Sequence, residues 1–221
     1  MKKIIALILA VASVLSLASC DRSYNEEEVR AAAEELVEKA IVLNEIFYGK
    51  GIDFDRDENT SNGAYYEASS YYVRNIGIET VEDLKDMALG VFSEDYAELI
   101  FSTVLSPVTD DSYIYGMARY YQKTDAVTGE NIAIMVYSEA NVYLTDKMEY
   151  DYSSIEVTGS KGERVYFNIS VKVTDSETDE EHIMTRSIAL IEEEGGWRID
   201  SPTYAQYSKS LEEYEEILNN K

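Results

Sequence analysis

The chain has 221 residues, with 19 basic against 43 acidic side chains and a formal net charge of −24. This balance argues against nucleic-acid binding, because phosphate recognition requires a basic face. It would instead attract a cationic partner, although the same charge also serves solubility. One cysteine in the whole chain excludes an intramolecular disulfide.

Residues 1–19 are typical of a secretory signal. Met1-Lys2-Lys3 supplies a positive start, and the uncharged run IIALILAVASVLSLA follows. This run is short for a membrane-spanning helix, which needs ~20 apolar residues. Leu17-Ala18-Ser19-Cys20 resembles the bacterial lipobox, which implies cleavage before Cys20 and diacylglycerol on its sulfur. We therefore expect a lipid-anchored protein on the extracytoplasmic side of the cell membrane; an ordinary secretory signal is the alternative.

Residues 20–63 are predicted to form a tether, an N-terminal helix and an acidic loop. The helix spans 24–48, where Ser23 and Glu26 have the spacing of a capping box and Gly49 follows the last apolar position. Apolar residues recur at helical spacing. They are Val29, Ala33, Leu36, Val37, Ala40, Leu43 and Phe47.

The loop 51–63 contains Asp53, Asp55 and Asp57, which mimic the start of a calcium-binding loop. An EF-hand then needs glycine at its sixth position and glutamate at its twelfth. Glu58 and Ala64 occupy those positions here. We therefore interpret the segment as an acidic loop and predict no metal site in it.

Residues 64–221 are predicted to form an α+β domain on which the helix 24–48 packs. Residues 65–75 have an extended pattern. Thr80 and Asp83 indicate the N-terminus of one short helix, and Ser93 that of a second, which ends before Pro107.

The segment from Ser112 to about Ile199 is dominated by strand and turn patterns. The sequence RVYFNISVKV alternates strictly, with Val165, Phe167, Ile169, Val171 and Val173 on one side. Such alternation indicates a strand with one buried and one wet face. Turn-rich stretches join it to its neighbours as antiparallel hairpins. A polar final helix is predicted over 210–221.

This order of elements predicts an α+β fold in which N-terminal helices pack on a curved antiparallel sheet. Two architectures have this arrangement, the NTF2-like and the cystatin-like folds, and the residues alone do not choose between them.

Tyrosine is the second bias in composition, with 19 tyrosines against 5 phenylalanines and 1 tryptophan. Tyrosine combines an apolar ring with a polar tip and therefore suits contact surfaces; strand tyrosines at the edge of the core are the alternative explanation. The candidate partner- or ligand-binding residues are Tyr71, Tyr72, Tyr113, Tyr115, Tyr120 and Tyr121.

The sequence contains no motif that indicates catalysis. His182 is the only histidine and lies beside acidic residues, where a solvated side chain is expected. Neither a nucleophile elbow nor a zinc, phosphate-binding or dinucleotide-binding motif occurs. Carboxylates are too abundant for any pair to be chosen as acid and base. We therefore predict no enzyme, no catalytic residue, no cofactor and no metal.

Several segments together resemble the DL-endopeptidase-inhibitor (IseA-like) proteins of Gram-positive bacteria. They are Tyr71-Tyr72, the run Thr80-Val81-Glu82-Asp83-Leu84 that opens a helix, Phe92-Ser93, and Asp111 with Tyr113 and Tyr115. The family commonly has an Asp-Gly turn before the first strand, where this chain has Asp110-Asp111-Ser112. The resemblance implies a non-catalytic protein that inhibits a cell-wall peptidase by binding its catalytic domain.

Two hypotheses of function follow. The first is a surface lipoprotein that binds a protein partner, with a cationic cell-wall peptidase as the specific candidate. The alternative is binding of a small ligand or wall fragment in an NTF2-like pocket between sheet and helices.

Overall fold

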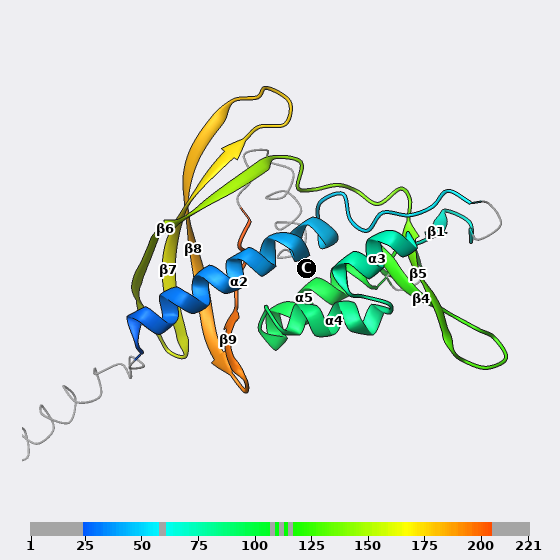
Figure 1. The fold of residues 1–221 in the computed structure, drawn as a ribbon, viewed down its shortest axis with the longest axis horizontal. Coiled ribbons are helices and arrows are strands. Elements are labelled where there is room, and N and C mark those ends of the chain that lie inside the picture. The colour runs from blue at the N-terminus through cyan, green and yellow to red at the C-terminus, as the bar shows by residue number, and fades with distance from the viewer. Residues whose placement is uncertain (1–23, 58–60, 107–108, 111–112, 115–116, 205–221) are drawn as a thin grey trace, which may run out of the picture.

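The computed structural model describes residues 24–57, 61–106, 109–110, 113–114 and 117–204. Within these residues the chain forms a long helix, a short strand, three further helices and then a series of antiparallel strands (Figure 1). The predicted α+β class, with helices packed on an antiparallel sheet, is confirmed. The predicted helix over 210–221 lies outside the described residues.

The N-terminal helix α2 spans Glu26–Phe47 and buries the predicted apolar face against the core. Its N-cap is Asn25, whose side chain accepts a hydrogen bond from the backbone N–H of Glu27 at 3.0 Å. The predicted capping box between Ser23 and Glu26 is therefore wrong, because the helix begins two residues later with Asn25 as its N-cap.

The extended pattern predicted for 65–75 is correct only at its start. Strand β1 covers Tyr65–Glu67, and helix α3 covers Ser70–Ile76. Gly77 ends this helix in the left-handed conformation (φ 75°), and its N–H donates to the carbonyls of Val73 and Arg74. The local glycine cap and the packing of Tyr72 and Val73 on the core override the strand preference of these residues.

The two short helices predicted next are both present. Helix α4 spans Val81–Leu89 and begins at the predicted N-terminus, where Thr80 and Asp83 form a capping box. Helix α5 spans Glu94–Val104, and the Ser93 side chain accepts from the N–H of Tyr96 at its start.

The remaining strands are antiparallel and divide between separate sheets, in the orders β1-β5-β4, β2-β3 and β6-β7-β8-β9. Their bounds are β2 Thr109–Asp110, β3 Tyr113–Ile114, β4 Tyr120–Thr124, β5 Asn131–Tyr137, β6 Lys147–Lys161, β7 Arg164–Thr174, β8 Glu181–Glu193 and β9 Gly196–Ile199.

The division into sheets was not predicted, and it follows from the segment between β5 and β6. The strand pattern there extends to Leu144, yet β5 ends at Tyr137. The backbone N–H groups of Tyr143 and Leu144 instead donate to the carbonyl of Tyr48, at 2.7 and 3.0 Å. The chain thus leaves the first sheet, is held by the end of α2, and begins the second sheet.

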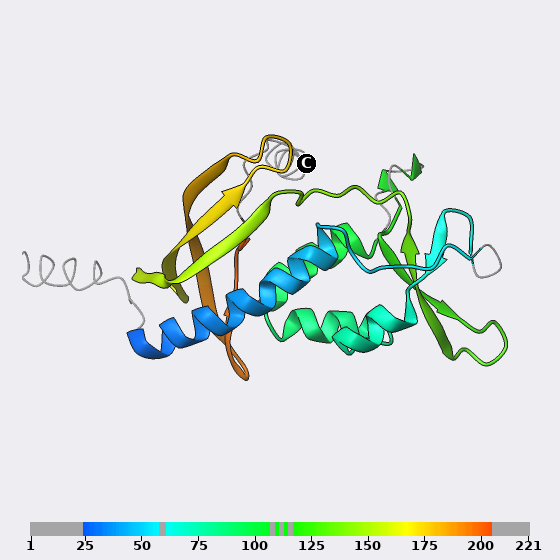
Figure 2. The same cartoon turned by 45° about the horizontal axis from the view of Figure 1, so that its top comes forward.

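Helix α2 lies along the β6-β7-β8-β9 sheet, and α3, α4 and α5 lie between this sheet and the β1-β5-β4 sheet (Figures 1 and 2). One hydrophobic core joins α2, α4, α5 and residues of both sheets. The five predicted inward residues of β7 are all 0% exposed, which confirms the alternation. Burial of this continuous core is the main stabilising contribution to the fold.

Candidate functional site

The clearest aromatic surface lies on the outer face of the β1-β5-β4 sheet, on the side away from the main core. Tyr65 is directly opposite Tyr137, and Tyr121 is opposite Met135, so the four side chains share one face. The ring centroids of Tyr65 and Tyr121 are 4.8 Å apart in an edge-on arrangement, and those of Tyr65 and Tyr137 are 5.3 Å apart. Met135 beneath them is fully buried. We call Tyr65, Tyr121, Tyr137 and Met135 the tyrosine face.

The hydroxyl groups of this face are hydrogen-bonded around its margin. Tyr65 donates to the carbonyl of Ala118 at 2.6 Å, and Tyr121 accepts from Asn62 at 2.8 Å. Tyr137 donates to Glu139 at 3.3 Å. Burial raises the pKa of Tyr65 and, together with the Glu139 carboxylate, that of Tyr137. The hydroxyls of Tyr65 and Tyr137 thus stay protonated at neutral pH, and their hydrogen bonds fix the two rings in place.

Tyr121 and Tyr137 remain half-exposed, whereas Tyr65 is 6% exposed. An ion pair between Lys123 and Glu67 (Nζ to Oε1, 2.8 Å) lies across the same face. The surface therefore combines rigid, partly exposed aromatic rings with charged groups at its edge. This is the composition of a protein-contact surface, in which tyrosine supplies contact area at a low cost in conformational entropy.

Tyr120 was predicted as a contact residue, and the structure shows that this is wrong. Its neighbour Tyr121 points outward, so the alternation of the strand turns Tyr120 into the core, where it is 0% exposed. Its hydroxyl donates to the carbonyl of Ile46 at 2.7 Å and accepts from the N–H of Ile52 and from Arg119. Tyr120 therefore holds the C-terminal end of α2 and is inaccessible to a partner.

The other predicted tyrosines do not join the tyrosine face as one patch. Tyr71 lies on α3 and is 77% exposed, while Tyr72 on the same helix is half-buried against the core. Burial, and then the proximity of Tyr120, raises the pKa of Tyr72. The backbone of Tyr113 in β3 pairs with that of Asp110 in β2, but the side chain of Tyr113 is not among the described parts of the structure. Tyr115 and Cys20 lie outside the described residues.

No cluster of three metal-binding side chains occurs in the described part of the chain, which includes Asp53, Asp55 and Asp57. His182 is half-buried on β8, with its Nε2 3.9 Å from Glu180 Oε2. Its side chain is less solvated than the sequence predicted, because it lies on the same face of β8 as the inward-facing Met184.

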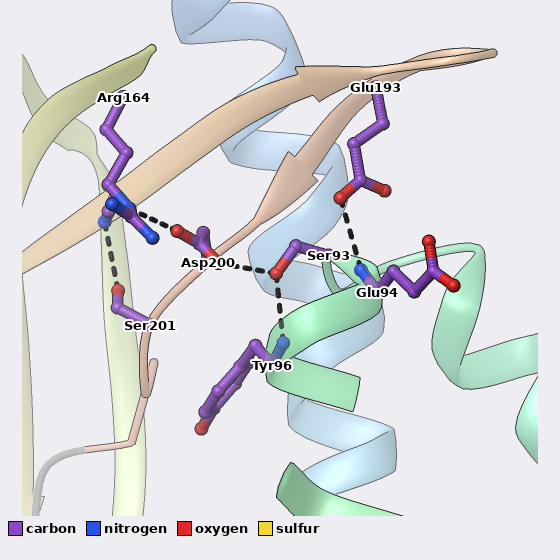
Figure 3. Close-up of polar contacts among 8 residues, drawn as sticks. Ser93, Glu94, Tyr96, Arg164, Glu193, Asp200 and Ser201 are labelled. Atoms are coloured by element: carbon purple, nitrogen blue, oxygen red, sulfur yellow. Dashed lines mark hydrogen bonds and ion pairs between the residues drawn. The ribbon is translucent and has the colours of Figure 1, made fainter. Parts of the chain in front are cut away.

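A buried carboxylate marks the junction between α5 and the second sheet (Figure 3). Asp200 is 5% exposed at its side chain; it accepts from Ser93 Oγ at 2.5 Å and pairs with Arg164. The carboxylate raises the pKa of Arg164. Ser93 at the same time caps α5, so its oxygen is occupied by the helix N–H. We assign this cluster to the fold, since both carboxylate oxygens of Asp200 are used in joining the start of α5 to β7.

The same junction is reinforced by backbone hydrogen bonds. Phe92 pairs in parallel with Ile199, and the N–H of Ser93 donates to the Ile199 carbonyl at 2.8 Å. Ser201 Oγ accepts from the N–H of Ala189 at 2.9 Å (Figure 3). Residues 91–93 thereby pair with the outer edge of β9 and extend the β6-β7-β8-β9 sheet by a short segment.

Within the described residues, none of the helices is long and apolar enough to cross a bilayer. No protein-family model matches the chain, and no curated protein is significantly similar to it.

The sequence-based candidates included Tyr121 but not Tyr65, Tyr137 or Met135. The signal for Tyr137 was its place at the end of the run NIAIMVY, two residues after Met135 and therefore on the same face of a strand. What the sequence did not contain was the pairing of β5 with both β1 and β4, which brings the three tyrosines together.

Proposed function

We propose that this chain is a non-catalytic, lipid-anchored extracytoplasmic protein that binds a protein partner through the tyrosine face. The observation that carries the proposal is the arrangement of Tyr65, Tyr121 and Tyr137 on the outside of a sheet whose other face already packs on the core. A sheet needs only one buried face for stability. The half-exposed rings of Tyr121 and Tyr137 on its second face are therefore available for recognition, and the buried Tyr65 supports them.

The charge of the chain supports a cationic partner. Helix α2 alone contains seven glutamates against one arginine and one lysine, and its outward positions are exposed. Such a field steers an oppositely charged protein and raises its association rate. A basic cell-wall hydrolase is a partner of this kind.

The finer proposal is that the protein inhibits a cell-wall DL-endopeptidase by covering its catalytic domain. It is supported by the resemblance of residues 71–115 to the IseA-like inhibitors and by the predicted location beside the wall. Inhibition by occlusion requires only a surface, and the tyrosine face supplies one without a reactive group of its own.

The test is a titration of the mature protein (residues 20–221) against the wall peptidases of its own host at two salt concentrations. We expect inhibition, with association that slows markedly as salt rises, because the Debye length falls from ~10 Å at 0.1 M to ~3 Å at 1 M salt. Dissociation should change less. Absence of both binding and inhibition across the set would refute the inhibitor proposal and leave binding of a small ligand or wall fragment as the better hypothesis.

The lipid anchor is tested separately by Cys20→Ala. Residues 21–28 after Cys20 contain four acidic side chains and one arginine, and anionic headgroups repel such a segment, so the lipid must hold the protein alone. We expect the variant to leave the membrane fraction. Continued membrane association of Cys20→Ala would show that another anchor exists.

A further inference from the structure

A groove of about 340 Å³ lies between the middle of α2 and the C-terminal end of α4, on different elements from the tyrosine face. It is open to the surface rather than enclosed. The apolar part of its lining is Val42, Leu43, Met87 and Val91, and its remaining lining residues are Lys39, Asp86 and Gly90.

The apolar wall of the groove is incompletely covered. Val42 is 46% exposed, although the residue after it in the helix is fully buried. Leu89, the last residue of α4 and next to the groove residue Gly90, is 37% exposed. A volume of this size is at the small end of the ~300–1,000 Å³ range of small-molecule pockets, and an open groove cannot enclose such a molecule. It has room instead for a few side chains of a larger partner.

The charges beside the groove indicate which charge a partner segment should have. Lys39 is already paired with Glu35, so its charge is largely compensated. Among the described residues, the carboxylate of the exposed Asp86 forms neither a hydrogen bond nor an ion pair. Both helices are acidic overall, since α4 has three acidic residues and one lysine. A basic segment would be favoured here and an acidic one repelled.

From this geometry we propose that the α2–α4 groove docks a basic amphipathic helix of a partner protein, with leucine-like anchors in the groove and lysine or arginine facing Asp86. Two helices that flank an apolar groove are a known way to receive a third, read through anchors at positions i, i+3 or i+4, and i+7. The inference does not depend on the tyrosine face or on peptidase inhibition.

The test uses a fluorescein-labelled 14-residue peptide of leucine and lysine, with leucine at the i, i+3, i+4 and i+7 positions. Its controls are a leucine–glutamate peptide of the same pattern and a leucine–lysine peptide of the same composition in alternating order. Anisotropy titrations with the mature protein should show binding of the first peptide and at least about tenfold weaker binding of both controls, since the anchors and the charge are both needed. Equal binding of either control would overturn the proposal.

Val42→Lys and Leu99→Lys provide matched variants. Each introduces one positive charge at an exposed apolar position, but Leu99, 53% exposed, lies on α5 and does not line the groove. We expect Val42→Lys to weaken the peptide about tenfold or more and Leu99→Lys to weaken it no more than about twofold. Equal weakening would mean that the peptide senses net charge alone, which would refute the groove.

Hydrogen exchange of the wild-type protein makes the test independent of any variant. The peptide should protect residues 39–43 and 86–91 and leave the β1-β5-β4 sheet unchanged. Protection elsewhere, or none, would contradict the proposal. Because these readouts do not involve a peptidase, their failure is distinct from failure of the proposed function.

Discussion

The two larger sheets differ in how they use their second face. In the β6-β7-β8-β9 sheet, the inward residues of β7 are fully buried, whereas Tyr166, Asn168, Ser170 and Lys172 on the outward face are half-exposed. In the β1-β5-β4 sheet, Ile134 and Val136 pack on the core, yet Met135 between them is also fully buried, under the tyrosine face. One sheet thus has an ordinary wet face, and the other has a second aromatic layer that the main core does not need. This difference is the reason to look for a binding surface on the smaller sheet.

The largest expected effect concerns the inner face of β7. Replacement of Phe167 by alanine should lower the free energy of unfolding by ~3–5 kcal/mol, because it removes a fully buried ring and leaves a cavity. Tyr166→Ala, one residue away on the half-exposed outer face, should cost clearly less. Urea melts of both variants measure the difference, and equal losses would contradict the contrast between the two faces.

The next largest effect is a difference in stability between substitutions on the two faces of β4. Tyr120→Phe removes a hydroxyl that bonds the Ile46 carbonyl, the Ile52 N–H and Arg119, and leaves buried polar groups unpaired. We expect a loss of about 1–3 kcal/mol. Tyr121→Phe removes one hydrogen bond, to the exposed Asn62, and should cost no more than about 0.5 kcal/mol. A larger loss for Tyr121→Phe would show that the tyrosine face is primarily structural.

The β4–β5 hairpin of one sheet and the β7–β8 hairpin of the other have the same type of turn. Exchanging one residue between these two turns should have a smaller effect on stability. In both hairpins an aspartate (Asp125 or Asp175) accepts from the N–H groups two and three residues on, and a residue with positive φ follows. That residue is Gly129 (φ 74°) in one hairpin and Asp179 (φ 57°) in the other. Because only glycine adopts this conformation at no steric cost, Asp179→Gly should stabilise the protein by roughly 0.5 kcal/mol.

Gly129→Asp is the reciprocal variant and should destabilise by a similar amount. Thermal melts of the two variants provide the check. If both substitutions destabilised the protein, the two turns would not be equivalent despite their matching hydrogen bonds.

The smallest expected effect on stability concerns the solvent-exposed face of the β6-β7-β8-β9 sheet. Hydrogen bonds from Lys147 and Lys172 lower the pKa of Glu149 from its ordinary 4.5 to about 2. The folded-state pKa is depressed, so this carboxylate stabilises the protein fully above pH 4.5, and the contribution is lost as the pH falls towards 2. Lys172→Met should therefore be less stable than wild type at neutral pH, and the difference should shrink through that window.

Lys161→Met is the control for this prediction, since Lys161 is exposed and makes no ion pair with the described residues. Unfolding by urea at several pH values measures both variants. A deficit of Lys172→Met that stayed constant down to pH 2 would refute the assigned role of Glu149.

How far the sequence predicted this structure depended on whether a feature is local. The apolar face of α2, the start of α4 at Thr80 and the alternation of β7 were predicted, because each is determined by neighbouring residues. Helix α3 was missed because its end depends on Gly77 and on packing of Tyr72. The tyrosine face could not be predicted, since Tyr65 and Tyr137 are distant in sequence and meet only through strand pairing. Tyr120 and Tyr121 were predicted together, although adjacent strand residues point to opposite faces.

The central claim, that the tyrosine face contacts a protein, is tested most directly by capture from the cell envelope of the host. The mature protein, its Tyr137→Ser variant and the control Tyr166→Ser would be immobilised in equal amounts after melts confirm that each is folded, and the captured proteins quantified. We predict that at least one captured protein is lost with Tyr137→Ser and retained with Tyr166→Ser, because only the first substitution lies on the tyrosine face. The same captured set for both variants would contradict the claim.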